Sequence, residues 1–419
     1  MWYEFDQEPH NHYEQRMFGM TISSLLKKVD IPLEVLILLI AGMALLITGI
    51  LLFPVSSGAL PYYENGLYGL LLVMFALQIV TMGKTPFGDV RRSKLIIAVG
   101  AVIAAVGIVT CFIPDVLTRL SRNLLFICFG PGSFLLFVQM VLAKNKFRTW
   151  IKLRGIFRHL IFACSMVYIL SMLIALLLWN QRILSTAMTA AAVLMYGVAV
   201  VYLACILGSI YRTYPEAEKR HKGDIEFSID QAMLLLMGIF MVLLGTLLIP
   251  VNLGKLSFSA SAQLGLLMVI FAVQMLASGN TPLGPFPRSR LMILSGLLFA
   301  ALGIVSCIIP DILVPLLTVL VGVLNILGGL VTLINIFIPL LRRSDETRGP
   351  VPTILKKLFA VQLTMNLLTI MFGTSMLVPR LVPGLVIGVI LAANGCVLLY
   401  LLHLLILLDK LQCDAGNGT

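Results

Sequence analysis

Two matched sets of polar residues border the long apolar segments of this chain, and their types could form ion pairs or a hydrogen-bonded gate. A carboxylate near the start of a helix is favoured by the positive end of the helix dipole, and an arginine at the same depth can neutralise it. We therefore predict that Arg92 and Arg288 each pair with Glu34 or Asp230 and tie neighbouring helices together. A gate or a lipid-headgroup site is the alternative. The matched positions are Glu34 with Asp230, Gln78 with Gln274, Thr85 with Thr281, and Arg92 with Arg288.

Four amide side chains inside apolar segments are a second group of candidates. Gln362 and Asn366 are four residues apart and therefore share one face of a helix. Such amides can line a polar cavity, and they can equally form hydrogen bonds between membrane helices, so both interpretations stay open. The candidate cavity residues are Asn325, Gln362, Asn366 and Asn394.

Signatures of catalysis are missing from the sequence. It contains no Gly-x-Ser-x-Gly, no His-Glu-x-x-His and no phosphate loop. The seven cysteines form no Cys-x-x-Cys pair, and His10 and His12 lie in an acidic tail that we interpret as solvated rather than metal-binding. No Asp or Glu lies near the middle of an apolar segment, which argues against a proton pump driven by carboxylates. We therefore predict a protein that is not an enzyme and has no catalytic residue, cofactor or resident metal.

The composition identifies the surroundings that these residues need. The chain is 59% hydrophobic and only 12% charged, with a mean hydropathy of +1.02. A bilayer can solvate that much apolar surface, whereas water cannot. A spanning helix needs about 20 apolar residues, so we predict an all-α polytopic membrane protein with about twelve such helices. Their predicted ranges are 32–53, 66–82, 95–114, 123–143, 157–178, 185–211, 231–250, 261–279, 291–310, 313–341, 356–378 and 383–408.

The distribution of positive charge predicts the orientation in the membrane. The termini and the even-numbered connections between the predicted helices carry 25 of the 30 Lys and Arg residues. Cytoplasmic segments are enriched in these residues, so we predict that both termini are cytoplasmic. The net charge of +11 is then explained by contact with anionic lipid headgroups, and we expect no nucleic-acid partner. A second copy of the chain or another membrane protein is left open as a partner.

The chain repeats itself at a fixed offset of 196 residues. Residues 78–115 match residues 274–311 without a gap, and the offset becomes 198 near the C-terminus. We interpret the halves as parallel copies of one six-helix unit, each made of three hairpins and related by a pseudo-two-fold axis along the membrane normal. The predicted organisation is a cytoplasmic tail (1–29), repeat 1 (30–211), a cytoplasmic linker (212–225), repeat 2 (226–409) and a cytoplasmic tail (410–419).

Pairs of glycines seven residues apart mark four of the predicted helices. Two turns separate such glycines, so they share one helix face, where they allow a neighbouring backbone to approach closely. We interpret them as packing residues, with a substrate path lined by glycine as the alternative. The pairs are Gly42 and Gly49, Gly100 and Gly107, Gly238 and Gly245, and Gly296 and Gly303, each followed by a proline.

This pattern of hairpins, glycine stripes and prolines resembles the HdeD-like acid-resistance membrane proteins. The similarity covers residues 32–145 and 231–341, and residues 296–336 show it best. It implies two fused units, a bacterial inner-membrane location and a role in membrane or acid stress tolerance. The parallel six-plus-six duplication also resembles the major facilitator superfamily, although Asp89 is followed by Val90 where that family has Asp-Arg. A transporter or channel for a small neutral or weakly charged solute is therefore the alternative function.

Overall fold

The apolar segments form helices because a backbone in lipid must satisfy its own hydrogen bonds. The computed structural model describes residues 32–81, 84–85, 88–89, 94–142, 155–180, 185–213, 229–278, 280–281, 284–285, 289–342, 353–378 and 382–416. In the first half, the helices are α2 (Leu33–Ser56), α3 (Glu64–Thr81), α4 (Lys94–Phe112), α5 (Thr118–Ile127), the π-helical turn η1 (Cys128–Gly132), α6 (Ser133–Leu142), α8 (Ile156–Trp179) and α9 (Thr186–Thr213). In the second half, they are α10 (Ile229–Asn252), α11 (Ala260–Ser278), α12 (Arg290–Ile308), α13 (Val314–Arg342), α14 (Thr353–Leu377) and α15 (Gly384–Gly416).

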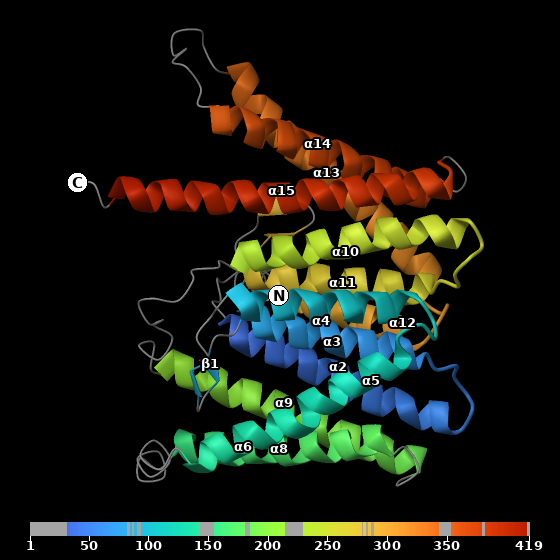
Figure 1. Ribbon diagram of the computed structural model, residues 1–419, viewed down its shortest axis with the longest axis vertical. Helices are drawn as coiled ribbons and strands as arrows, with labels where there is room; N and C mark the ends of the chain where they lie inside the picture. Colours follow the sequence, from blue (N-terminus) through green and yellow to red (C-terminus); the bar gives the residue numbers. More distant parts are fainter. Residues whose placement is uncertain are drawn as a thin grey trace, which may run out of the picture.

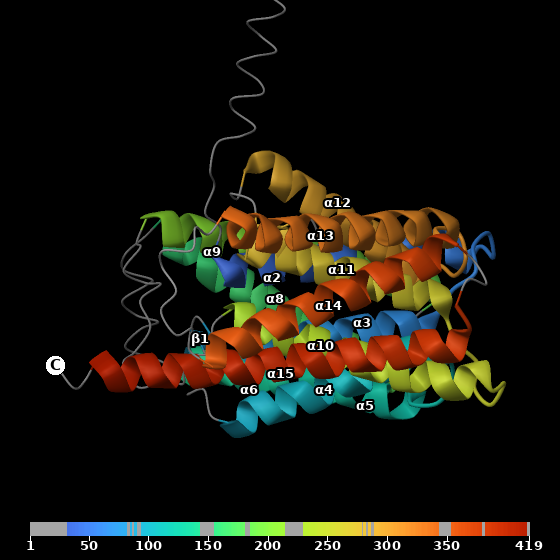
Figure 2. The ribbon, with the colours of Figure 1, turned by 90° about the horizontal axis from the view of Figure 1, so that it is seen from above.

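These elements confirm the predicted all-α polytopic membrane fold. With α5, η1 and α6 counted as one span, the described residues contain eleven helices that are long and apolar enough to cross a membrane. A twelfth apolar helix, Glu64–Val80, is slightly shorter. Most helices lie side by side along a common direction, so their connections gather at two ends of the bundle (Figures 1 and 2). We call the end that holds the connections after α2, α4, α8, α10, α12 and α14 the distal face.

The closest packing joins helices that are not always neighbours in sequence. In the first half α2 packs most closely on α9 and α3 on α4, and in the second half α10 packs on α15 and α11 on α12. Glycine makes these contacts close. A Cβ atom at Gly49 would lie 2.8 Å from the backbone of Leu194, and one at Gly197 would lie 2.7 Å from the backbone nitrogen of Leu46. The glycine stripes therefore lie at helix–helix contacts, as the packing interpretation predicts.

The connections repeat between the halves as faithfully as the helices do. Asp115 and Asp311, at equivalent positions after a proline, have φ values of 66° and 67°, a left-handed conformation that Asp tolerates in turns. Two short antiparallel strand pairs also correspond: β1 (Lys84–Thr85) with β2 (Gly88–Asp89), and β3 (Asn280–Thr281) with β4 (Gly284–Pro285). The local structure therefore follows the sequence repeat in both kinds of connection.

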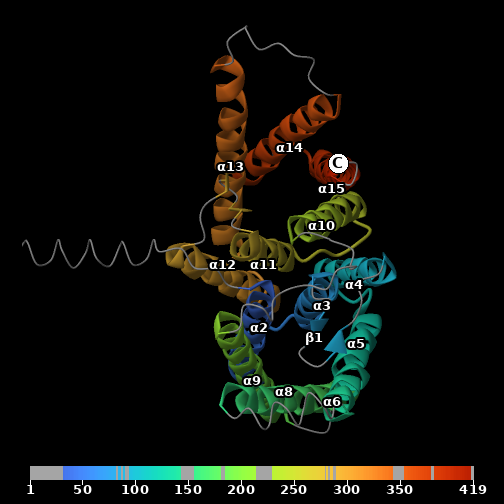
Figure 3. The same cartoon turned by 90° about the vertical axis from the view of Figure 1, so that its left-hand side faces the viewer.

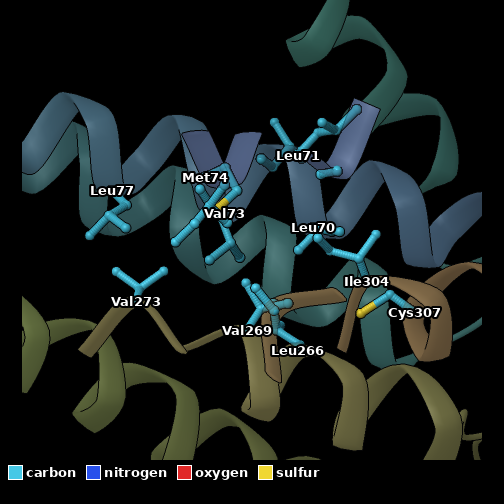
Figure 4. Close-up of a cluster of buried hydrophobic side chains, with 14 of the residues drawn as sticks. Leu70, Leu71, Val73, Met74, Leu77, Leu266, Val269, Val273, Ile304 and Cys307 are labelled. Carbon is cyan, nitrogen blue, oxygen red and sulfur yellow. The ribbon is translucent and has the colours of Figure 1, made fainter. Parts of the chain in front are cut away.

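The two halves meet through α2, α3 and α4 on one side and α10, α11 and α12 on the other. Two equivalent backbone hydrogen bonds cross this interface, from Tyr63 N–H to the Ile308 carbonyl and from Ser259 N–H to the Phe112 carbonyl, both at 2.9 Å. Between them, apolar side chains of α3 point toward those of α11 (Figure 4). Leu70 and Leu266, both buried, belong to this layer. Reciprocal bonds of this kind are what two parallel copies around a two-fold axis should make.

The halves differ in their fourth span. In the first half a π-helical turn containing Pro131 interrupts it, because proline lacks the N–H that an α-helix needs and kinks the chain. The bent span packs on α8, and the first-half helices surround a common interior (Figure 3). In the second half Leu327 replaces Pro131 and α13 continues unbroken over 29 residues. It packs on α14 but is steeply inclined to most of the other helices (Figure 3).

Replacing Gly69 by alanine tests whether the glycine contacts hold the bundle together. A Cβ atom there would lie 2.6 Å from Cys111 Cβ on α4, so we expect a loss of about 1–3 kcal/mol or more in stability. Gly208→Ala is the matched control, because its Cβ would lie an ordinary 3.4 Å from Val35. Thermal unfolding of the detergent-solubilised protein measures both, and equal melting temperatures for the two variants would contradict the expectation.

Candidate functional site

The first predicted polar set is only partly visible. Glu34 lies in the first turn of α2, where its Oε2 accepts a hydrogen bond from the Tyr211 hydroxyl on α9. Gln78 and Gln274 are half-buried near the ends of α3 and α11. Thr85 and Thr281 lie in β1 and β3, and Asp230 lies in α10, but their side chains are outside the description. Arg92 and Arg288 lie outside the described residues, so the predicted arginine pairs stay predictions.

The second predicted set, the amides, lies in the second half. Asn325, Asn366 and Asn394 are buried on α13, α14 and α15, while Gln362 is half-buried. Asn325 Nδ2 donates to the Val321 carbonyl of its own helix at 2.8 Å. Among the described residues, Asn366 Nδ2 and Asn394 Oδ1 are buried without a hydrogen-bond partner. Leaving such a group unpaired costs roughly 1–3 kcal/mol.

Among the described residues, the first half contains a cavity of about 410 Å³ whose lining reaches the distal face. Helices α2, α3, α5, α8 and α9 supply its walls, together with η1 and the connection before α3. Leu71 lies seven residues after Glu64, so the cavity reaches about 10 Å into the bundle. We call it the distal cavity. Its lining residues are Leu45, Thr48, Leu52, Tyr62, Glu64, Leu67, Tyr68, Leu71, Leu125, Phe129, Ile174, Leu177, Leu178, Thr186, Thr189 and Val193.

The inner end of the distal cavity is closed by aromatic rings. Phe129, which lines it, contacts Phe75 with ring centroids 5.0 Å apart and Tyr196 with centroids 5.8 Å apart. Two serines fix this floor: the Ser171 hydroxyl donates to the Phe129 carbonyl at 3.0 Å, and Ser133 donates to Ser171 at 2.7 Å. The π-helical turn places Phe129 beside Ser171. The lining of the cavity therefore ends at Phe129, and hydrogen bonds from Ser171 and Ser133 hold this floor in place.

The rim of the distal cavity is polar and aromatic, whereas its walls are mostly apolar. Of the two wall threonines, Thr48 and Thr189, the first donates its hydroxyl to the Ala44 carbonyl of its own helix. The Tyr68 hydroxyl donates to Glu64 Oε1, and Arg122 on α5 is close enough to interact electrostatically with Tyr68. Burial, with a smaller contribution from the Glu64 carboxylate, raises the pKa of Tyr62, so its phenol stays protonated even in alkaline solution. Thr186 adds another hydroxyl. The rim can therefore bind a polar head while the walls hold an apolar chain.

Sequence reasoning missed the distal cavity. Its rim residues Glu64, Tyr62 and Tyr68 have Ala260, Phe258 and Leu264 at the equivalent positions of the second half. Because the surrounding sequences match closely, polar residues confined to one copy were the available signal. The tripeptide Gly130-Pro131-Gly132 similarly marked the kink that positions Phe129.

Among the described residues, no cluster of three or more His, Cys, Asp or Glu side chains could hold a metal ion. No family model, no curated protein and no solved structure matches this chain. The fold and the site are therefore interpreted from their own geometry.

Replacing Ser171 by alanine tests the floor of the distal cavity. The change removes hydrogen bonds to both Ser133 and Phe129, so we expect a loss of about 1 kcal/mol or more in thermal stability. Ser165→Ala on the same helix is the control, because that hydroxyl bonds only to the Ile161 carbonyl of its own helix in the described contacts. Equal melting temperatures of the two variants would show that Ser171 does not support the floor.

Proposed function

We propose that this chain is a non-enzymatic multi-pass membrane protein that binds a small amphipathic molecule in the distal cavity. The observation that carries the proposal is the separation of a polar rim at Glu64 and Tyr68 from apolar walls in one pocket. Its volume of about 410 Å³ falls within the roughly 300–1,000 Å³ typical of small-molecule sites. A molecule with one apolar chain and a hydrogen-bonding head fits this division.

A transporter that works by rocking its halves is less well supported. Such proteins place their solute at the interface between the repeats, near the middle of the membrane. Here buried apolar side chains, including Leu70, Met74 and Leu266, occupy that interface among the described residues (Figure 4). The distal cavity ends at the Phe129 ring instead of continuing across the bundle. These features favour binding over passage.

The resemblance to HdeD-like proteins extends the proposal to the cell. It suggests a bacterial inner-membrane location with cytoplasmic termini, contact with anionic headgroups on that side, and a role in membrane or acid stress tolerance. A receptor for amphipathic molecules in the distal leaflet suits such a role, because its occupancy would report the state of the bilayer.

Native mass spectrometry of the purified protein with octanoyl lysophosphatidylethanolamine, whose short acyl chain matches the depth of the distal cavity, tests the proposal. The wild-type protein should retain one molecule of this single-chain lipid more firmly than any further molecules of it that bind. Thr189→Trp places an indole in the distal cavity and should reduce that retention at least tenfold. Ile387→Trp, at the equivalent and similarly half-buried position of α15, should leave it unchanged.

Two results would count against this function. One is a wild-type protein that retains no lipid beyond statistical adducts at any concentration of the probe. The other is a folded Thr189→Trp variant that retains the lipid as firmly as Ile387→Trp does, since that would place the bound molecule elsewhere on the protein.

A further inference from the structure

The three buried asparagines of the second half occupy a layer that the first half fills with aromatic rings. With the sequence offsets of 196 and 198, Asn325 corresponds to Phe129, Asn366 to Tyr168 and Asn394 to Tyr196. In the first half these aromatic residues are buried, and Phe129 packs edge-on against Tyr196. At equivalent positions, the first half therefore has aromatic rings and the second half has amide side chains. We call Asn325, Asn366 and Asn394 the amide layer.

The packing of α13 and α14 brings two members of the amide layer to one seam. A Cβ atom at Gly373 on α14 would lie 3.0 Å from Asn325 Cβ, and one at Gly329 on α13 would lie 3.1 Å from the Asn366 carbonyl oxygen. Among the described side-chain positions of α14, residues 357–377, only Asn366, Phe372 and Gly373 are buried. One of the few buried positions of α14 is thus occupied by the amide Asn366 rather than by an apolar residue.

The unsatisfied atoms define what the amide layer can bind. Asn366 Nδ2 is a donor without an acceptor, and Asn394 Oδ1 is an acceptor without a donor. Both side chains are more than nine-tenths buried, at 5% and 6% exposure. Asn366 and Asn394 lie at similar distances from the connection between α14 and α15, and these two helices pack on each other. An occupant between them must therefore offer one acceptor and one donor and must be small enough to enter a buried layer.

Charge in the surroundings restricts the occupant further. The nearest described side chains on these helices with a carboxyl group or a basic nitrogen are Lys357 and His403. Each lies nine residues from Asn366 or Asn394, about 13 Å along its helix. Among the described side chains of these three helices an ion in the layer would find no counter-charge within two turns, and its burial would be costly. The occupant is therefore neutral.

From these observations we propose that the amide layer is a second binding site, which takes a small neutral solute of the carboxamide or urea class. Such a solute presents a carbonyl oxygen to Asn366 Nδ2 and an N–H group to Asn394 Oδ1. This site lies in the second half and does not depend on ligand binding in the distal cavity. The first half has no equivalent of this site, because aromatic residues occupy the corresponding positions.

Saturation-transfer NMR on the purified full-length protein with acetamide tests the site. The acetamide methyl signal should show transfer from the protein, whereas acetate, which is charged, should show none, and acetone, which lacks a donor, should show less. Asn366→Leu and Asn394→Leu should each reduce the acetamide transfer at least fivefold. Asn335→Leu, which removes an exposed amide from α13, should leave it unchanged.

Replacement by the first-half residues keeps the test decisive if the leucine variants do not fold. Asn366→Tyr and Asn394→Tyr install the side chains that the equivalent layer already accommodates, and they should also abolish the acetamide signal. Acetamide transfer equal to that of acetate in the wild type would overturn the proposal. Folded variants that keep the acetamide signal would also overturn it. A third contradicting result is the absence of any acetamide signal together with non-additive losses of stability in the double variant, because it would show that the two asparagines bond to each other.

Discussion

Direct contact between helix backbones at glycine is the constraint on which the rest of this structure depends. Apolar side chains gain little by leaving lipid for a protein interior, so close van der Waals packing must hold the helices together. Gly69 and Gly107 lie in such a contact between α3 and α4, and Gly265 and Gly303 repeat it between α11 and α12. Tyr63 and Ser259 stand just before α3 and α11, and their N–H groups donate hydrogen bonds to carbonyl groups of the other half. Without the glycine seams, the reciprocal bonds between the halves would have no fixed geometry.

Duplication followed by divergence explains the differences between the halves. The same backbone frame surrounds a bent fourth span in one copy and a straight α13 in the other. In the first copy, the bend brings Phe129 over Tyr196 and closes the bottom of the distal cavity. In the second copy, amides stand in that layer. One inherited frame has therefore provided an aromatic floor in one half and a buried polar layer in the other.

Much of the fold could be predicted from the sequence because it depends on composition and repetition. Apolar length marks the spans, and the offset of 196 residues marks the two copies and their equivalent turns, such as those at Asp115 and Asp311. The pairing of α2 with α9 was not predictable in this way. The helix α2 is apolar on nearly every side, so its sequence contains no amphipathic stripe to indicate the face that meets a neighbour. The distal cavity depends on that pairing and on the kink at Pro131, and neither follows from hydropathy.

Some candidate site residues could be recognised from the sequence and others could not, and the difference lies in their local surroundings. The amides were recognisable because a polar group in an apolar helix is conspicuous. Glu64 and Tyr68 were not, because they stand at a helix start, where polar residues are ordinary.

An experimental density map of the protein in lipid nanodiscs tests the central claim most directly. The account predicts elongated density that runs from the Tyr68 and Glu64 rim to the Phe129 ring, with the α3–α11 interface filled by side chains. A collapsed first half with Leu71 against Val193, or an open channel between the halves, would contradict it.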